Sequence, residues 1–136
     1  MTERSLMPKA SLVSIVEDDQ FFRESLRRLI KSQGYIVEAF SSAADFLGSS
    51  RLIETACVIA DVNMPGMSGI ELHRHLVKGG RSIPTILVTA YPNDSDRASA
   101  LNDGVVCYLR KPINDEHLIR CLRAALPSVE VPAENS

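Results

Sequence analysis

Several residues with chemically useful side chains come at or just after the ends of short apolar runs. In chain order they are Glu17, Asp18, Asp61, Thr89 and Lys111. Each of them alone has an ordinary structural explanation, such as a helix cap, a turn former, a β-branched strand residue or a solvated charge. Their shared position relative to the apolar runs makes the set a candidate site.

Three carboxylates gathered in one cleft would repel one another, and a divalent cation would relieve that repulsion. Carboxylate, carbonyl and water ligands suit Mg²⁺ or Mn²⁺, and the sequence offers no Cys/His set for a softer metal. An aspartate beside such a cation can attack a phosphorus centre, while a lysine and a hydroxyl stabilise the transferred group. The residue types therefore predict an acyl phosphate on Asp61, assisted by Lys111 and Thr89.

The elements that would position these residues alternate along the chain. Apolar, strand-like runs are followed by segments with helical spacing of apolar residues. The expected strands cover residues 12–16, 35–40, 56–60, 84–90 and 105–110. The expected helices cover residues 19–34, 41–50, 68–80, 93–104 and 114–126. This alternation predicts an α/β fold, a single doubly wound five-stranded parallel sheet with helices on both faces and its site beyond the carboxyl ends of the strands.

Local signals refine this outline. Ser68 and Glu71 have the spacing of a capping box, which predicts a helix start, whereas the Asn-, Asp- and Ser-rich segment 93–104 predicts a weak helix. The chain is expected to divide into a flexible lead-in (1–10), one domain (11–126) and a proline-containing tail or linker (127–136).

Composition excludes several classes of function. The 136 residues carry a net charge of -2 and 45% hydrophobic residues, which fits one globular domain without a broad basic field for nucleic acid or an anionic membrane. No secretory or membrane-spanning run is evident, so a cytoplasmic protein is expected. The three cysteines, Cys57, Cys107 and Cys121, are expected to be buried free thiols rather than a disulfide or a zinc site.

The whole arrangement resembles the receiver domain of bacterial two-component response regulators. The stretches VEDDQFFR, VIADVNMPGMSG, VTA and YLRKP match the motifs of that family in order and at suitable separations, over roughly residues 11–126. The resemblance implies a flavodoxin-like receiver with strand order 2-1-3-4-5. The stretches VEAFSSAADFL and PGMSGIEL are similar to receivers of the FixJ type.

The resemblance also implies a role for each matching position. Asp61 would be the phosphoacceptor, and Mg²⁺ would be held by Glu17, Asp18, Asp61 and the backbone carbonyl of Asn63. Thr89 would bind the phosphoryl group and Lys111 would form a salt bridge with it, while Tyr108 matches the aromatic switch residue that moves inward together with Thr89. A cis bond between Lys111 and Pro112 is implied as well. All of these residues are present in the sequence.

A phosphorelay switch follows from this resemblance. A sensor histidine kinase or a phosphotransfer protein would donate a phosphoryl group to Asp61, and the domain would catalyse its own phosphotransfer and slow self-dephosphorylation without being an enzyme in the usual sense. The surface that changes would bind a downstream domain or protein, or a second copy of the chain. Only ten residues follow Leu126, so the chain is expected to be a single-domain regulator or an excised receiver, with no direct contact to nucleic acid or membrane.

Two alternatives stay open at the level of sequence. A degenerate receiver would act as a phosphorylation-independent interaction module. A phosphohydrolase of the haloacid dehalogenase type would also use an aspartyl nucleophile, but it would need a second aspartate two residues later, where this chain has Asn63.

Overall fold

A single parallel sheet forms the centre of the computed structural model, which describes residues 10–126. The strand order is β2-β1-β3-β4-β5, and every neighbouring pair is parallel. The expected fold class and strand order are confirmed. Apart from Ala10, the expected lead-in (1–10) and tail (127–136) lie outside the described residues. The strands are β1 (Leu12–Val16), β2 (Ile36–Phe40), β3 (Thr55–Asp61), β4 (Thr85–Thr89) and β5 (Cys107–Arg110).

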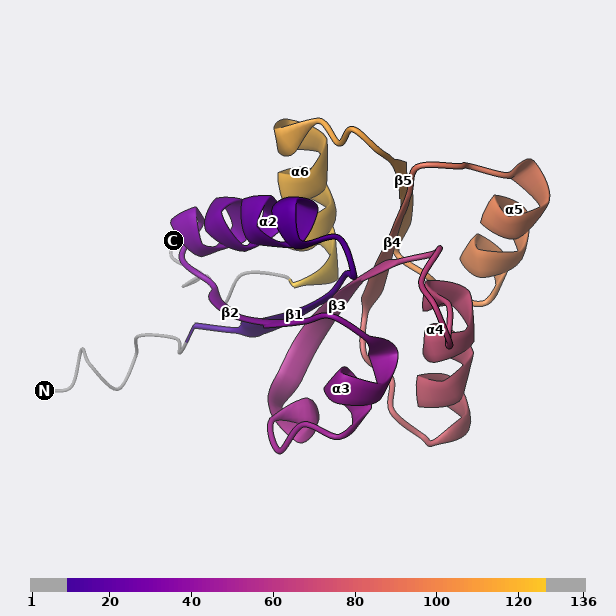
Figure 1. Ribbon diagram of the computed structural model, residues 1–136, viewed down its shortest axis with the longest axis horizontal. Coiled ribbons are helices and arrows are strands. Elements are labelled where there is room, and N and C mark those ends of the chain that lie inside the picture. The colour runs from indigo at the N-terminus through magenta and orange to yellow at the C-terminus, as the bar shows by residue number, and fades with distance from the viewer. Residues whose placement is uncertain (1–9, 127–136) are drawn as a thin grey trace, which may run out of the picture.

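Helices cover both faces of the sheet, as Figure 1 shows. Helices α2 and α6 lie on one face, and α3, α4 and α5 lie on the other. Within residues 10–126, no helix is long and apolar enough to cross a bilayer. The helices are α2 (Gln20–Ser32), α3 (Ala43–Leu47), the 3₁₀ helix η1 (Leu52–Glu54), α4 (Gly69–Lys78), α5 (Asp94–Asn102) and α6 (Asp115–Ala125).

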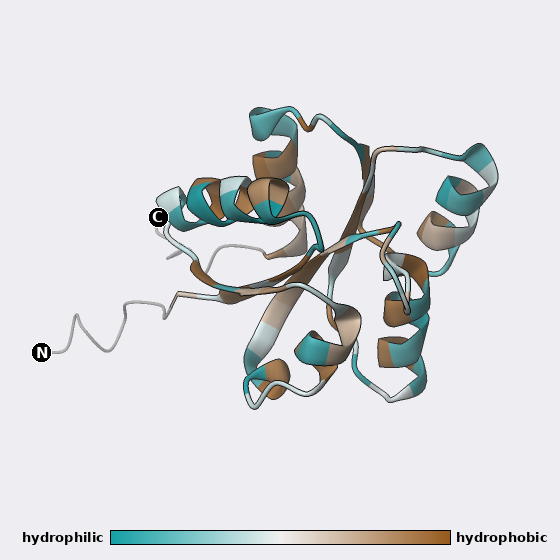
Figure 2. Cartoon of the chain, viewed as in Figure 1, coloured by the Kyte–Doolittle hydropathy of each residue, from teal (hydrophilic) through white to brown (hydrophobic). Residues whose placement is uncertain are grey.

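The sheet separates two hydrophobic clusters, one under each helical layer. The first joins β1, β3 and β4 to α2 and α6 through residues such as Ile30 and Leu118, and the second joins the opposite face to α3 and α4 through residues such as Phe46 and Leu72. Figure 2 shows apolar strands and two-sided helices whose polar residues face outward. Burial on both faces explains why the strand sequences are continuously apolar rather than alternating.

Helix starts follow their local sequence signals. The Ser68 hydroxyl accepts a hydrogen bond from the Glu71 amide (3.1 Å), and the Glu71 carboxylate accepts one from the Ser68 amide (2.9 Å), which confirms the capping box. These bonds satisfy amides that have no partner inside the helix. Helix α4 therefore begins directly after the turn that follows Asp61.

Helix α5 is the least anchored of the helices that the structure describes with a full α-helical turn or more. Its one buried side chain is Ala100, and most of its other residues are polar, although Leu101 is exposed. The Asn93 side chain accepts a hydrogen bond from the Asp96 amide and caps the helix start (2.9 Å). Few buried apolar contacts mean that little free energy opposes displacement of this helix.

One expectation is wrong. Cys107 in β5 and Cys121 in α6 were expected to be free thiols, but the structure joins them as a disulfide, with their Cα atoms 6.4 Å apart. Cys57 is a buried free thiol, as expected. The fourteen-residue separation of Cys107 and Cys121 did not indicate their contact, because that contact depends on how α6 packs against the sheet.

Candidate functional site

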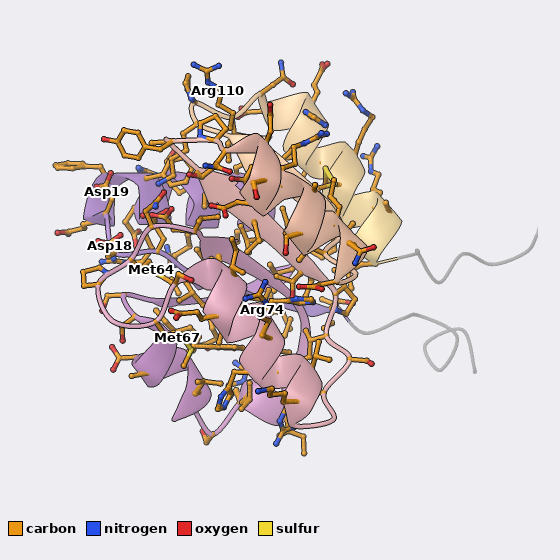
Figure 3. The ribbon with its side chains drawn as sticks, turned by 90° about the vertical axis from the view of Figure 1, so that its right-hand side faces the viewer. Asp18, Asp19, Met64, Met67, Arg74 and Arg110 are labelled. Atoms are coloured by element: carbon orange, nitrogen blue, oxygen red, sulfur yellow. A yellow bond between two sulfur atoms is a disulfide. The ribbon has the colours of Figure 1, made fainter. Side chains whose placement is uncertain are left out.

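Four of the predicted site residues lie at the same edge of the sheet. Glu17 follows β1, Asp61 ends β3, Thr89 ends β4, and Lys111 follows β5. Because all strands are parallel, their carboxyl ends must meet at this edge. Figure 3 shows Asp18 at the same edge as the loop that carries Met64 and Met67, just after Asp61.

Lys111 connects the carboxylates. Its Nζ atom lies 3.0 Å from Glu17 Oε1 and 3.3 Å from Asp61 Oδ2, and it also lies 4.3 Å from the centre of the Phe22 ring. Burial lowers the pKa of Lys111, but the adjacent carboxylates of Glu17 and Asp61 outweigh this effect and leave the pKa raised. Lys111 is therefore protonated, and its ammonium group is fixed by the two carboxylates. The Lys111–Pro112 bond is cis, as expected.

The acidic cluster consists of Glu17, Asp18 and Asp61, which can each offer one carboxylate oxygen with all three oxygens within 4.8 Å of one another. Glu17 and Asp61 are buried, whereas Asp18 is exposed. Such a set has one solvent-facing member and two members shielded from water. Hard oxygen ligands in this arrangement fit a divalent cation such as Mg²⁺.

The buried carboxylate of Glu17 is a second feature of this cluster that suits a cation. Burial, together with the charge of Asp61, raises the pKa of Glu17 to about 7, against the lowering effects of the Asp19 amide and Lys111. Its Oε1 atom is fully buried and accepts no well-oriented hydrogen bond within the described residues, although Lys111 Nζ lies near it. Its other oxygen accepts a bond from the Asp19 amide (3.0 Å). The residues present therefore fit a bound cation.

Asn63 links Asp61 to Thr89. The backbone amide of Asn63 donates to Asp61 Oδ1 (3.1 Å), and the Thr89 hydroxyl donates to the side-chain oxygen Oδ1 of Asn63 (2.8 Å). The Thr89 oxygen in turn accepts a bond from the Tyr91 amide (3.0 Å). Sequence reasoning assigned only the backbone carbonyl of Asn63 and missed this use of its side chain. No local pattern indicates it, because the two residues are 26 positions apart.

Tyr108 is buried on the α5 side of the sheet. The residue is 9% exposed, and its hydroxyl accepts a hydrogen bond from the backbone amide of Asn93 (3.3 Å) at the start of α5. A side chain on β5 is thus in direct contact with the weakly anchored helix. The inward movement expected for this residue stays a prediction.

Arg23 is a further residue that sequence reasoning missed. Its guanidinium donates to the backbone carbonyl of Glu17 (2.8 Å) and tethers the β1–α2 loop to α2. The Asp19 side chain caps the same helix by accepting from the Phe21 amide (3.2 Å). These two contacts fix the loop that carries Glu17 and Asp18. The arginine inside VEDDQFFR was the available signal.

The fold and the site together define a doubly wound α/β domain with an acidic cluster and a lysine at the carboxyl edge of its sheet. The family described as "Response regulator receiver domain" matches residues 13–123. The chain belongs to this family and is a receiver domain of two-component response regulators. Receiver domains are signalling domains rather than enzymes in the usual sense.

Named relatives agree with this assignment. The chain is 37% identical to the response regulator protein TodT of Pseudomonas putida over 90% of its own length and 54% of that protein. It is 35% identical to the transcriptional regulatory protein FixJ of Azorhizobium caulinodans over 88% of its length and 57% of that protein. The chain therefore spans about half the length of these relatives.

Solved structures support the same fold. The crystal structure of FixJ-N has a TM-score of 0.78 with this chain at 30% sequence identity, and the match covers 91% of this chain and all of that one. The predicted resemblance to FixJ-type receivers is confirmed by these comparisons.

Proposed function

We propose that this domain is a phosphorelay switch that accepts a phosphoryl group on Asp61 with the help of Mg²⁺. The observation that carries the proposal is the position of the Asp61 carboxylate, which lies within reach of Glu17, Asp18 and the Lys111 ammonium at one edge of the sheet. This arrangement combines a nucleophile, a cation site and a fixed positive charge.

The metal would be held by Glu17, Asp18, Asp61 and the backbone carbonyl of Asn63. When bound, Mg²⁺ supplies positive charge that stabilises negative charge on the phosphoryl oxygens. Manganese has the same preference for oxygen ligands and can replace it. The buried Glu17 Oε1 pairs with Lys111 Nζ (3.0 Å) but accepts no well-oriented hydrogen bond within the described residues, and a bound cation would give it a further partner.

The transfer step is a nucleophilic displacement at phosphorus. An oxygen of Asp61 forms the new P–O bond, and the bond to the nitrogen of a donor phosphohistidine breaks, with that nitrogen leaving as the donor imidazole. Lys111 already contacts Asp61 Oδ2 and would neutralise charge on the transferred group. The Thr89 hydroxyl would leave Asn63 and donate to the phosphoryl oxygen.

The change would spread through Thr89, Tyr108 and α5. Thr89 ends β4, and the Tyr108 hydroxyl touches the start of α5 through the Asn93 amide. Movement of Thr89 would alter the space next to Tyr108 and bias α5 between two positions. The slow hydrolysis of the acyl phosphate by the domain itself would reset the switch.

The donor would be a sensor histidine kinase or a phosphotransfer protein, in the cytoplasm. The named relatives include a transcriptional regulator, so the altered surface would act on an output domain, a downstream protein or a second copy of the chain. The proposal includes no contact of this domain with nucleic acid or membrane. The domain bounds 11–126 and a linker at 127–136 belong to the same proposal.

Labelling with acetyl phosphate in the presence of Mg²⁺ tests the proposal. We expect intact-mass spectrometry to show one added phosphoryl group that hydroxylamine removes, because hydroxylamine cleaves acyl phosphates. The label should be lost in Asp61→Asn. It should be retained in Asp103→Asn, a matched carboxylate change at the C-terminal end of α5. No label, or the same label in Asp61→Asn, would favour a phosphorylation-independent interaction module.

Turnover of phosphomonoesters separates the switch from a phosphohydrolase. The place of a second catalytic aspartate is taken by Asn63, whose side chain is bonded to Thr89. We therefore expect no sustained release of phosphate from simple phosphomonoesters. Multiple turnovers of such an ester that depend on Asp61 would contradict the switch.

A further inference from the structure

Cys107 and Cys121 join β5 to α6 on the face of the sheet opposite Tyr108. Cys107 packs with the cluster under α2 and α6, whereas Tyr108, the next residue, belongs to the cluster under α3, α4 and α5. The Cα separation of 6.4 Å lies within the range of about 4.4–6.8 Å that disulfides span. Figure 1 shows that α6 lies next to the edge strand β5.

The accessibility of the two cysteines differs. Cys121 is 4% exposed, but Cys107 is only partly buried at the start of an edge strand. A thiol or disulfide reagent can therefore approach Cys107 first. Exposed disulfides exchange with external thiols more readily than buried ones.

Cys57 does not compete for this chemistry. It lies in the middle of the central strand β3 with no exposed surface, and burial raises the pKa of its thiol to about 12. Because the thiolate is the reactive form, Cys57 is a poor nucleophile. Any thiol–disulfide chemistry of this chain would therefore involve Cys107 and Cys121 rather than Cys57.

The fold does not depend on the disulfide for its core. Both hydrophobic clusters are formed by residues from several strands and helices, and a domain of this size buries enough surface to fold without a covalent link. Disulfides that are essential for folding occur mainly in small domains with little core. The reduced and oxidised forms can therefore both be folded.

We propose that Cys107 and Cys121 form a reversible dithiol–disulfide pair, a redox modification site between β5 and α6. With a low-molecular-weight disulfide such as oxidised glutathione as oxidant, the Cys107 thiolate attacks one of its sulfurs and releases one glutathione thiol. The Cys121 thiolate then attacks the Cys107 sulfur of the mixed disulfide and releases the second. The two cysteines lose two electrons and two protons, and the oxidant gains them as two thiols.

Oxidation ties the edge strand to the last helix. The closed loop includes the Lys111 segment and the start of α6, and it removes conformational freedom from the unfolded chain. Closure of a loop of this length should raise the melting temperature of the oxidised form by roughly 10–15 °C. The reduced form has the more mobile contact between β5 and α6.

Thiol counting in glutathione buffers tests the pair directly. The full chain is equilibrated with mixtures from fully reduced to fully oxidised glutathione, quenched, denatured and alkylated, and its mass is measured. We expect three alkylated cysteines at the reduced end and one at the oxidised end, with a linked Cys107–Cys121 peptide. The change should reverse on return to reduced buffer.

Three variants sharpen the result. Cys57→Ala should keep the two-thiol change, and Cys121→Ala should lose both the linked peptide and the redox dependence of the melting temperature. Asp61→Asn should titrate as the parent chain does, so a failure of the phosphorelay function leaves this result unaffected. The proposal would be overturned if the Cys57 thiol disappeared on oxidation or if dimers linked between chains formed. It would also be overturned if the pair stayed oxidised, or stayed reduced, in all buffers.

Discussion

Asn63 controls where the Thr89 hydroxyl points. In the structure this hydroxyl donates to Asn63 Oδ1 at 2.8 Å rather than to Asp61. In the proposed switch this bond would have to break before Thr89 could donate to a phosphoryl group on Asp61. A typical net hydrogen bond contributes about 1 kcal/mol, so it would oppose the proposed change by roughly fivefold.

Asn63→Ala should therefore favour the phosphoryl-bound state. The backbone carbonyl of residue 63 is kept, so the expected metal ligand is unchanged. We expect beryllofluoride, which mimics a phosphoryl group, to bind roughly fivefold more tightly in the presence of Mg²⁺. Isothermal titration calorimetry measures this change. In a Thr89→Ala background the gain should vanish, and an equal gain in that background would show that Asn63 acts by another route.

Glu17 should make Mg²⁺ binding depend on pH. Its pKa is raised to about 7 in the metal-free domain, so a proton competes with the cation as the pH falls through that value. We expect Mg²⁺ affinity to be lower at pH 6 than at pH 8, with proton release on binding. Calorimetry in buffers of different ionisation enthalpy measures both effects. Glu17→Gln should bind Mg²⁺ more weakly and show a flatter pH profile.

The same group affects the metal-free fold with the opposite sign. A carboxyl whose pKa is higher in the folded state stabilises the fold fully below its ordinary value of 4.5. That contribution is lost as the pH rises through about 7, because the unfolded chain releases the proton first. A pH titration of the free energy of unfolding without Mg²⁺ should show a smaller decline in Glu17→Gln.

At the scale of the elements, α4 approaches β3 closely at Gly69. A Cβ atom at this position would lie 2.5 Å from the Asp61 carbonyl oxygen and 3.1 Å from Leu87 Cδ2. The Gly69 amide also donates to the Val62 carbonyl (3.2 Å). The small residue therefore lets the capped start of α4 pack under the end of the strand that carries Asp61.

Gly69→Ala should destabilise the domain by about 1–3 kcal/mol, because overpacking forces the backbone to move. It should also weaken Mg²⁺ binding, since the displaced backbone belongs to Asp61. Urea unfolding and calorimetry measure the two effects. Gly79→Ala is the matched control at the other end of α4, where the added Cβ would lie 3.5 Å from the nearest atom. Equal losses in both variants would show that the close contact at Gly69 is not responsible.

At the scale of the whole molecule, the site joins segments that are distant in the chain. Its carboxylates follow β1 and β3, and Lys111 follows β5. A cation that binds only the folded arrangement must stabilise the entire domain by mass action. Repulsion among the three carboxylates lowers the stability of the metal-free fold.

Magnesium should therefore raise the melting temperature of the domain. At one hundred times the dissociation constant the gain in stability is about 2.7 kcal/mol, which corresponds to several degrees. Asp18→Asn should abolish most of this gain. Because Asp18 is exposed, the variant should not melt lower than the parent chain without metal. Calorimetric scans with Mg²⁺ or with EDTA measure the difference, and an equal rise in the variant would exclude Asp18 as a ligand.

The sequence by itself determined the alternation of strands and helices, the helix starts and the identity of the edge at which the site lies. These features depend on local spacing and on caps such as Ser68 with Glu71, and parallel strands bring their carboxyl ends together whatever their order. Residues after successive strands could therefore be grouped from spacing alone. The order of the strands came from the resemblance to receivers, because local patterns do not say which strands are neighbours.

Only the tertiary structure decided which side chains touch. The Thr89–Asn63 bond and the Cys107–Cys121 disulfide both join residues on different elements, and neither has a local signature. Each depends on the rotation and distance of one element relative to another. Periodicity indicates which face of a helix or strand is buried, but not which residue of the neighbouring element lies opposite. The same limit hid the pKa of Glu17, which is raised by burial and by Asp61.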